Sequence, residues 1–253
     1  MYIKSYKPLV GYFLMKRFDH VSPLSYRYLP KDGELCRTLE SYSELEILPK
    51  IKRTVPEIVV PRLHLLERKI IAFYDEYSSR VIPRRVDGEH VGKISVFELF
   101  SGYANRLERI TKTIKRLKLN FGELEEATRN DRIFELVCYL SAAFSIEASI
   151  ANDIRHHFRS EIGEFGFRDF DPRRVGSSTM PHKRNPVEFE NVVSLWKVYA
   201  SPTLASASLA QITEHQGDST NEFLPYSVFE LAIALSFVTK EMENNLGDLR
   251  LEV

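Results

Sequence analysis

The chain has 253 residues, of which 43% are hydrophobic and 28% are charged, an ordinary balance for a globular protein. Its 35 basic and 35 acidic residues cancel, so the composition argues against a general nucleic-acid-binding or membrane-binding surface. The length allows one large domain or two small ones.

The cysteine content and the hydropathy argue against a disulfide-linked, metal-binding or membrane-spanning protein. Cys36 and Cys138 lie far apart and in no metal-like spacing, so we expect two reduced thiols in a cytoplasmic protein and no metal site. We find no apolar run that approaches the roughly 18 residues needed to cross a bilayer. Residues 1–18 surround a short apolar run with basic residues but lack a small-residue cleavage site, so we expect no signal peptide.

Six segments have the apolar spacing of three and four residues that is typical of amphipathic helices. In chain order they are 35–48, 63–77, 94–119, 131–158, 186–209 and 219–246. Pro49 is predicted to end the first helix. Long helices with broad apolar faces pack along one another, so the pattern predicts an all-α, long-helix bundle.

Strand signals are nearly absent from the sequence. Residues 249–253 are predicted to form a short extended end. Residues 163–174, rich in Phe, Arg, Asp and Gly, are predicted to form a loop that leads to the most informative segment of the chain.

That segment runs from Gly176 to Pro186 and reads GSSTMPHKRNP. It is a polar loop between two predicted helices, with many hydrogen-bond donors and the cation of Lys183. Such a loop can hold an anion and present a hydroxyl group as a nucleophile or base.

The segment resembles the signature loop of the fumarase/aspartase superfamily of lyases, G-S-S-x-M-P-x-K-x-N-P, and residues 176–191 most resemble adenylosuccinate lyase. Residues 21–28, VSPLSYRY, look like the segment of that enzyme in which an Arg-Tyr pair meets the nucleotide phosphate. Residues 154–164 are similar to the helix end before the signature loop. The resemblance implies the superfamily's helical bundle, here expected without its C-terminal domain, and no cofactor.

The resemblance also implies a β-elimination that removes a proton beside a carboxylate, expels an amine and releases fumarate. Ser177 would be the base, and Lys183 and Asn185 would hold the substrate carboxylates. The other implied site residues are Ser178 and Met180 in the loop, Glu190 as a group that orients either the general acid or Lys183, and Arg27 and Tyr28 at the phosphate.

The chain departs from the family pattern at the general acid. The family's histidine falls at Asp87 and its glutamine at Glu89, whereas His90 comes three residues late, so Asp87 and His90 are the candidate acids. A carboxyl group serves as an acid only where burial or a like charge raises its pKa.

Further departures flank the signature. The Gln and Arg that precede the family's central helix read here as Glu126 and Asn130. Residues 214–220 resemble a segment that carries a substrate-binding arginine and phosphate-binding serines. There His215 replaces one arginine, Ser219 is a phosphate-binding candidate, and Phe223 falls near a second expected arginine.

We therefore expect a shortened N-terminal helical region at 1–90 and a bundle domain at 91–253 that carries the loop. One interpretation is an adenylosuccinate-lyase-like C–N lyase of purine biosynthesis in the cytoplasm, acting on a nucleotide-succinate. The alternative is a catalytically silent paralogue that serves as an interaction or regulatory subunit. The retained loop favours these two over a decayed gene product or an unrelated helical scaffold.

The expected partners follow from the same resemblance. The family's tetramers build each active site from loops of three subunits. We expect a homo-oligomer, either a dimer or a homotetramer, or a hetero-oligomer with a full-length lyase. We expect neither a nucleic-acid nor a membrane partner.

Overall fold

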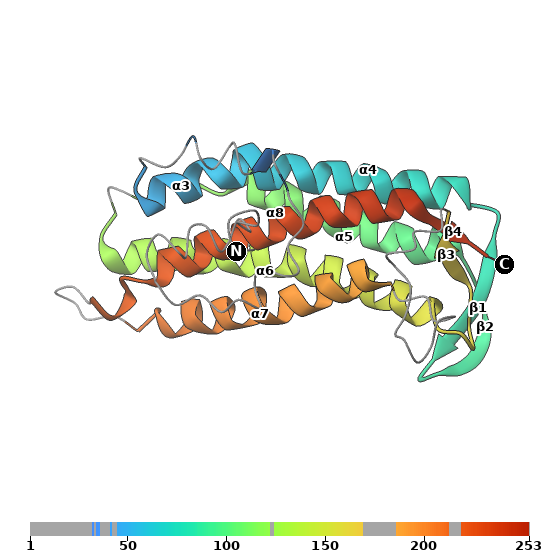
Figure 1. Cartoon of the computed structure of the whole chain (residues 1–253). Coiled ribbons are helices and arrows are strands. Elements are labelled where there is room, and N and C mark those ends of the chain that lie inside the picture. The colour runs from blue at the N-terminus through green and yellow to red at the C-terminus, as the bar shows by residue number, and fades with distance from the viewer. Residues whose placement is uncertain are drawn as a thin grey trace, which may run out of the picture.

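The computed structural model describes residues 32, 34–35, 41, 45–121, 124–168, 186–212 and 219–252, which form a bundle of long helices (Figure 1). The helical elements are α3 (Ile47–Thr54), the π-helix η2 (Val55–Val59), α4 (Val60–Glu76), α5 (Val96–Arg116), α6 (Glu126–His157), α7 (Val187–Leu209), the 3₁₀-helix η4 (Ser219–Asn221) and α8 (Leu224–Asp248). The four short strands are β1 (Val81–Val86), β2 (Glu89–Ser95), β3 (Phe165–Phe167) and β4 (Leu249–Leu251). The predicted all-α bundle is therefore confirmed.

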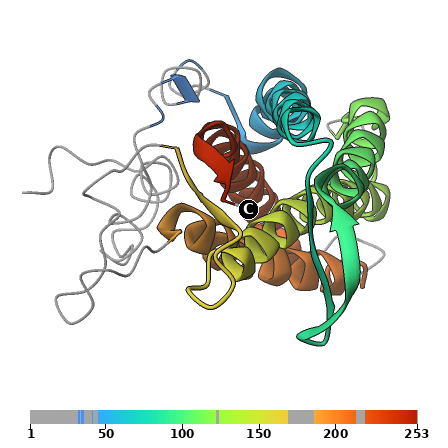
Figure 2. The same cartoon turned by 90° about the vertical axis from the view of Figure 1, so that its right-hand side faces the viewer.

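Helix α6 lies at the centre of the bundle. It packs against α5, α7 and α8, and α4 closes the bundle by packing against α5 and α8. Figure 2 shows these helices side by side, seen from one end of the bundle. Leu140 and Phe144 of α6 are fully buried inside this chain, so a charge at either position would disrupt its own core.

An 18-residue window of α6 has a mean hydropathy of 1.6, so among the described helices α6 is long and apolar enough to cross a membrane. The expectation that the chain lacks an apolar stretch of that length was wrong. In the structure, however, 61% of that window is buried against the other helices, as in the core helix of a bundle.

The expected near-absence of strands was wrong for residues 81–95, where β1 and β2 form an antiparallel hairpin. Asp87 and Gly88 form its two-residue turn with φ angles of 51° and 89°, both in the left-handed region. An Asp-Gly pair between two strand segments is a strong signal for such a turn. Helix α5 then begins after Ser95, whose hydroxyl accepts a 3.0 Å hydrogen bond from the Glu98 backbone N–H in a capping box.

The first predicted helix is also corrected. Helix α3 begins at Ile47, so Pro49 lies in its first turn and does not end it. A proline is tolerated there because the first turn of a helix has no partner for its N–H groups. Pro56 then lies in the π-helix that joins α3 to α4, where its missing N–H interrupts the regular hydrogen-bond pattern.

The extended end predicted near the C-terminus is confirmed as β4, which pairs antiparallel with β3. Arg168, at the end of β3, secures this small sheet. Its Nη2 donates to Glu76 Oε2 at 2.6 Å, and its Nε donates to the carbonyl oxygen of Leu249 at 3.2 Å. The strand that leads into the signature segment is thus held by both α4 and the end of α8.

A carboxyl group is buried in the core between α6 and α8. Thr239 Oγ1 donates to Glu147 Oε1 at 2.7 Å, whereas Glu147 Oε2 is buried without a partner among the described residues. Burial raises the pKa of Glu147 to about 8, because the hydrogen bond from Thr239 offsets only part of the desolvation.

The raised pKa makes stability depend on pH. The folded chain holds a proton on Glu147 that the unfolded chain releases near its ordinary pKa of 4.5, so stability falls as pH rises from there towards 8. We expect wild type to lose up to about 1.4 kcal/mol of unfolding free energy per pH unit in this window. In urea unfolding Glu147→Gln should show a shallower slope than wild type, whereas Glu135→Gln, at a partly exposed site, should keep the wild-type slope. Parallel pH curves for wild type and Glu147→Gln would contradict the assignment.

Candidate active site

The last turns of α6 contact the start of α7, and both segments belong to the part of the sequence that resembles the lyase superfamily. Arg155 Nη2 lies 3.9 Å from Glu190 Oε1 on the first turns of α7. Both side chains are partly exposed, so the pair is worth at most about 1 kcal/mol and leaves Glu190 free to change partner. Its main effect is to place a predicted site residue at the end of α6.

On the hairpin side, α6 contributes to a network around Glu164, which is buried just before β3. Arg85 of β1 binds this carboxylate with both terminal nitrogens, at 2.6 and 3.1 Å. His157 Nδ1 lies 2.5 Å from Glu164 Oε2. Burial alone would raise the pKa of Glu164, but the hydrogen bonds and charges of Arg85 and His157 lower it below its ordinary value, so the carboxylate stays ionised.

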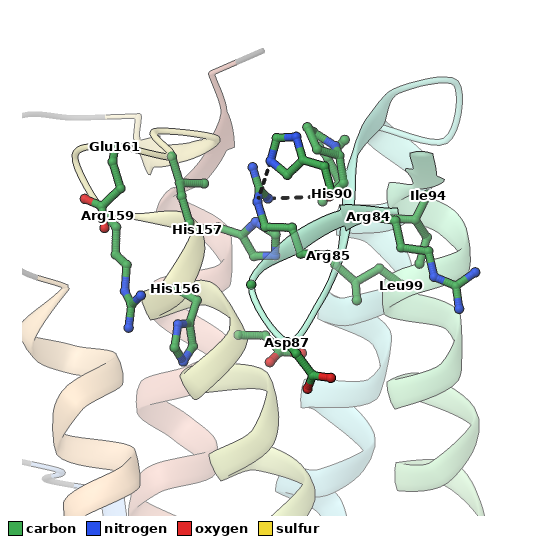
Figure 3. A pocket seen from close by; sticks show the side chains of 15 residues that line it. Arg84, Arg85, Asp87, His90, Ile94, Leu99, His156, His157, Arg159 and Glu161 are labelled. Atoms are coloured by element: carbon green, nitrogen blue, oxygen red, sulfur yellow. Dashed lines mark hydrogen bonds between the residues drawn. The ribbon is translucent and has the colours of Figure 1, made fainter. Parts of the chain in front are cut away.

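A cavity of about 810 Å³ lies between the hairpin and the end of α6. Figure 3 shows Arg84, Arg85, Asp87 and His90 on its hairpin side and His156, His157 and Arg159 on its α6 side. Apolar side chains such as Ile82, Ile94 and Leu99 complete the wall. The cavity therefore combines an apolar surface with several titratable groups, as ligand sites commonly do.

The two candidate acids of the hairpin lie at this cavity but are exposed. Asp87 occupies the turn of the hairpin, where its side chain is exposed within this chain. Arg85 Nε donates to His90 Nε2 at 3.1 Å, so that nitrogen carries no proton in this arrangement. Within one chain, therefore, neither Asp87 nor His90 is placed to act as the general acid.

A second cavity of about 400 Å³ lies at the other end of the bundle. Glu126, Arg129 and Asn130 reach it from the start of α6, and Asn221 and Glu222 reach it from the residues before α8. The structure thus brings Glu126 and Asn130, one of the departures from the family pattern, next to residues 221–222, which lie between Ser219 and Phe223. Asn130 has a structural role there, since its buried Nδ2 donates to the carbonyl oxygen of Ala210 at 3.3 Å.

The two cavities are separated by the length of α6. That helix has 32 residues, and a rise of 1.5 Å per residue makes it about 48 Å long. A small substrate cannot touch both ends of one chain. Among the described residues, no hydrogen bond or ion pair joins Glu190 to Asp87 or His90.

Most of the predicted site residues lie outside the described residues. These are Arg27, Tyr28, Ser177, Ser178, Met180, Lys183, Asn185 and His215. Ser219 begins η4, two residues before Asn221, which lines the second cavity. The roles assigned to these residues stay predictions.

Sequence reasoning missed His157, Glu164 and Arg85 as site residues. The residues 154–164 were recognised as a pattern, but the pattern did not show that a helix end and a hairpin meet at one carboxylate. The available signal was a histidine in the last turn of a long helix, followed seven positions later by a glutamate before a short Phe-Gly-Phe strand.

Comparisons with known proteins add independent findings. A protein family described as Lyase matches residues 100–197. The N-acetyl-S-(2-succino)cysteine lyase of Dickeya dadantii is 29% identical over 192 residues, which cover 72% of this chain and 40% of that protein. The adenylosuccinate lyase of Methanocaldococcus jannaschii is 35% identical over 105 residues, covering 41% of this chain and 22% of that protein.

A solved structure agrees with the fold. The class II fumarase of Schistosoma mansoni superposes with a TM-score of 0.65 at 16% identity, covering 81% of this chain and 55% of that one. At this identity the likeness concerns the fold alone. The chain spans about half the length, or less, of these three proteins.

The ion pair at Glu164 predicts a specific stability effect. Arg85→Ala leaves a buried carboxylate with one partner fewer, and we expect a loss of about 3 kcal/mol of unfolding free energy at neutral pH. Because the pKa of Glu164 is lowered, this stabilisation is present above the unfolded pKa and disappears as pH falls through the folded one. Urea unfolding at several pH values measures both effects.

Arg53→Ala is the matched control, since it removes an exposed arginine whose partner Glu57 is also exposed. We expect that variant to lose less than about 1 kcal/mol. Equal losses for the two variants would show that the Glu164 pair stabilises the fold no more than a surface pair.

Proposed function

The chain belongs to the fumarase/aspartase superfamily of lyases, and on that premise we propose that it takes part in an adenylosuccinate-lyase-like C–N elimination that releases fumarate from a nucleotide-succinate. One observation carries the proposal. The Lyase family match runs without interruption from 100 to 197, so it includes α6, the signature segment and Glu190 at the start of α7. The Arg155–Glu190 pair joins the helix before the signature segment to the helix after it.

In the proposed reaction, Ser177 takes the proton from the carbon beside a substrate carboxylate. Lys183 and Asn185 bind the carboxylates and stabilise the charge that develops on them. The electron pair of the broken C–H bond forms the fumarate double bond, and the C–N bond breaks with its electrons moving to nitrogen. An acid then protonates the leaving nitrogen.

A second chain is part of the proposal. Members of the superfamily are typically oligomeric and act on small molecules. The 48 Å estimate for α6 places its two ends too far apart for one substrate, so we propose that a partner copy or a full-length lyase completes each site. The outer face of α7 supports this, because Lys197 is the one charged residue between 191 and 212 and Val198 and Leu209 are exposed.

A C–S substrate is a second candidate for the same elimination. The N-acetyl-S-(2-succino)cysteine lyase match covers more of this chain than the adenylosuccinate lyase match. Exposed Phe223 stands near a position where the nucleotide-binding family has an arginine, which weakens the case for a phosphate. A succinyl thioether would undergo the same chemistry with sulfur as the leaving atom.

The alternative, a catalytically silent paralogue, is supported by the two candidate acids of the hairpin. Asp87 is exposed and His90 Nε2 accepts a hydrogen bond from Arg85, so neither replaces the family's acid within one chain. Loss of a general acid typically costs about 100- to 10,000-fold in rate. A chain of this kind would still bind the dicarboxylate product.

Fumarate release tests the proposal. Purified chain should release fumarate from adenylosuccinate or from N-acetyl-S-(2-succino)cysteine, and Ser177→Ala should lower the rate at least about 100-fold by removing the base. The preferred substrate, measured by kcat/KM, separates the C–N from the C–S candidate.

The control is Ser78→Ala, which changes an exposed serine in the turn after α4 and should leave the rate unchanged. No release from either substrate, with fumarate still raising the melting temperature, would support the silent paralogue. Release that is unchanged in Ser177→Ala would contradict the assigned base.

A further inference from the structure

His157 and Glu164 form a hydrogen-bonded dyad at the hairpin cavity. Glu164 is buried, does not line the cavity, and lies 2.5 Å from His157 Nδ1. An ionised carboxylate accepts a hydrogen bond and cannot donate one, so the shared proton sits on Nδ1 of the imidazole. The carboxylate thereby sets both the tautomer and the orientation of the ring.

The other edge of the ring is available for chemistry. His157 lines the cavity, and no hydrogen bond to its Nε2 exists among the described residues. Its ring also packs against Phe165, with 4.9 Å between the centroids, which limits its rotation. The result is a fixed imidazole that presents Nε2 to a cavity of about 810 Å³.

We propose that His157 is the general acid that protonates the leaving atom, in place of the acid that the hairpin lacks. This inference rests on the proposed elimination. The C–H proton goes to the base of that elimination, its electron pair forms the fumarate double bond, and the C–N or C–S pair moves to the leaving atom. The Nε2 proton of His157 joins that atom, and solvent returns a proton to Nε2 afterwards.

Arg85 and Glu164 act as positioning residues. The bidentate contact with Arg85 helps to keep Glu164 ionised despite its burial, so the carboxylate can hold the imidazole in both of its protonation states. Because Arg85 belongs to β1, the hairpin holds the His157–Glu164 dyad in place through this ion pair. This gives the hairpin a function in a chain whose own Asp87 and His90 are exposed.

The charged groups around the cavity fit an anionic substrate near the acid. Arg84, Arg85 and His90 face it from the hairpin, and His156 and Arg159 face it from α6 and its end. The acidic groups there are Asp87, Asp153 and Glu161, of which Asp153 accepts a hydrogen bond from the Tyr103 hydroxyl.

The first test is kinetic, on the full chain. His157→Gln should lower kcat at least about 100-fold for a succinyl amine or alkyl thioether, because such leaving groups need a proton. A substrate with an aryl thiolate leaving group, which needs none, should be nearly insensitive to the change. A merely structural role would lower both rates equally, and that result would overturn the proposal.

The pH profile gives a second kinetic readout. An acid must be protonated, so wild-type kcat should fall at high pH, and His157→Gln should lose that limb. Glu164→Gln, which keeps the size of the side chain, should lower the rate for the amine substrate and spare the aryl thiolate. His64→Gln changes a histidine of α4 that does not line the cavity and should leave both rates unchanged.

A measurement that needs no turnover separates this inference from the proposed function. In ¹H–¹⁵N spectra of the imidazole groups, the Nδ1 proton of His157 should appear far downfield and disappear in Glu164→Gln. Saturating fumarate should shift the Nε2 signal of His157 and leave that of His64, on the outside of α4, in place.

If wild type releases no fumarate, the proposed elimination fails for this chain alone. The imidazole spectra then test whether the His157–Glu164 dyad faces a ligand site. A fumarate-dependent Nε2 shift would then support a dicarboxylate site at His157. An Nε2 signal that fumarate does not move would overturn the inference.

Discussion

The burial of α6 along its whole length is the constraint on which the rest of the structure depends. Its apolar residues need helices on three sides, and α5, α7 and α8 provide them. Because the helix is continuous over 32 residues, its polar ends are about 48 Å apart, and each end carries its own cavity. The same residues that stabilise the fold therefore divide the candidate site into two parts.

At one end, Glu164 connects the distant hairpin to the end of α6 and to the strand that follows it. Arg85 of the hairpin, His157 of α6 and the strand before the signature segment meet at one buried carboxylate. A buried charge is tolerated only with such partners. The structure thus explains how a hairpin without the family's histidine is still tied to the part of the chain that leads into the signature loop.

The long apolar helices and the signature segment could be predicted because each is recognised from residues that are close together in the sequence. Periodic Ile, Leu and Phe residues report burial directly, and the order GSSTMPHKRNP is specific by itself. The hairpin was not predicted although Asp87-Gly88 marks its turn, because its strands are mostly exposed and lack the alternating apolar pattern of a half-buried strand. The Glu164 network was not predictable, since Arg85 and Glu164 are 79 positions apart and only the bundle brings them together.

The central claim is that the two ends of one chain belong to two different active sites. Co-expression of Ser177→Ala with Arg129→Ala, at the start of α6, tests it by fumarate release from the mixed oligomers. If sites are shared between chains, two weak variants should regain up to about one quarter of wild-type activity, because mixed dimers contain one intact site. Activity no higher than the average of the two separate variants would contradict the account.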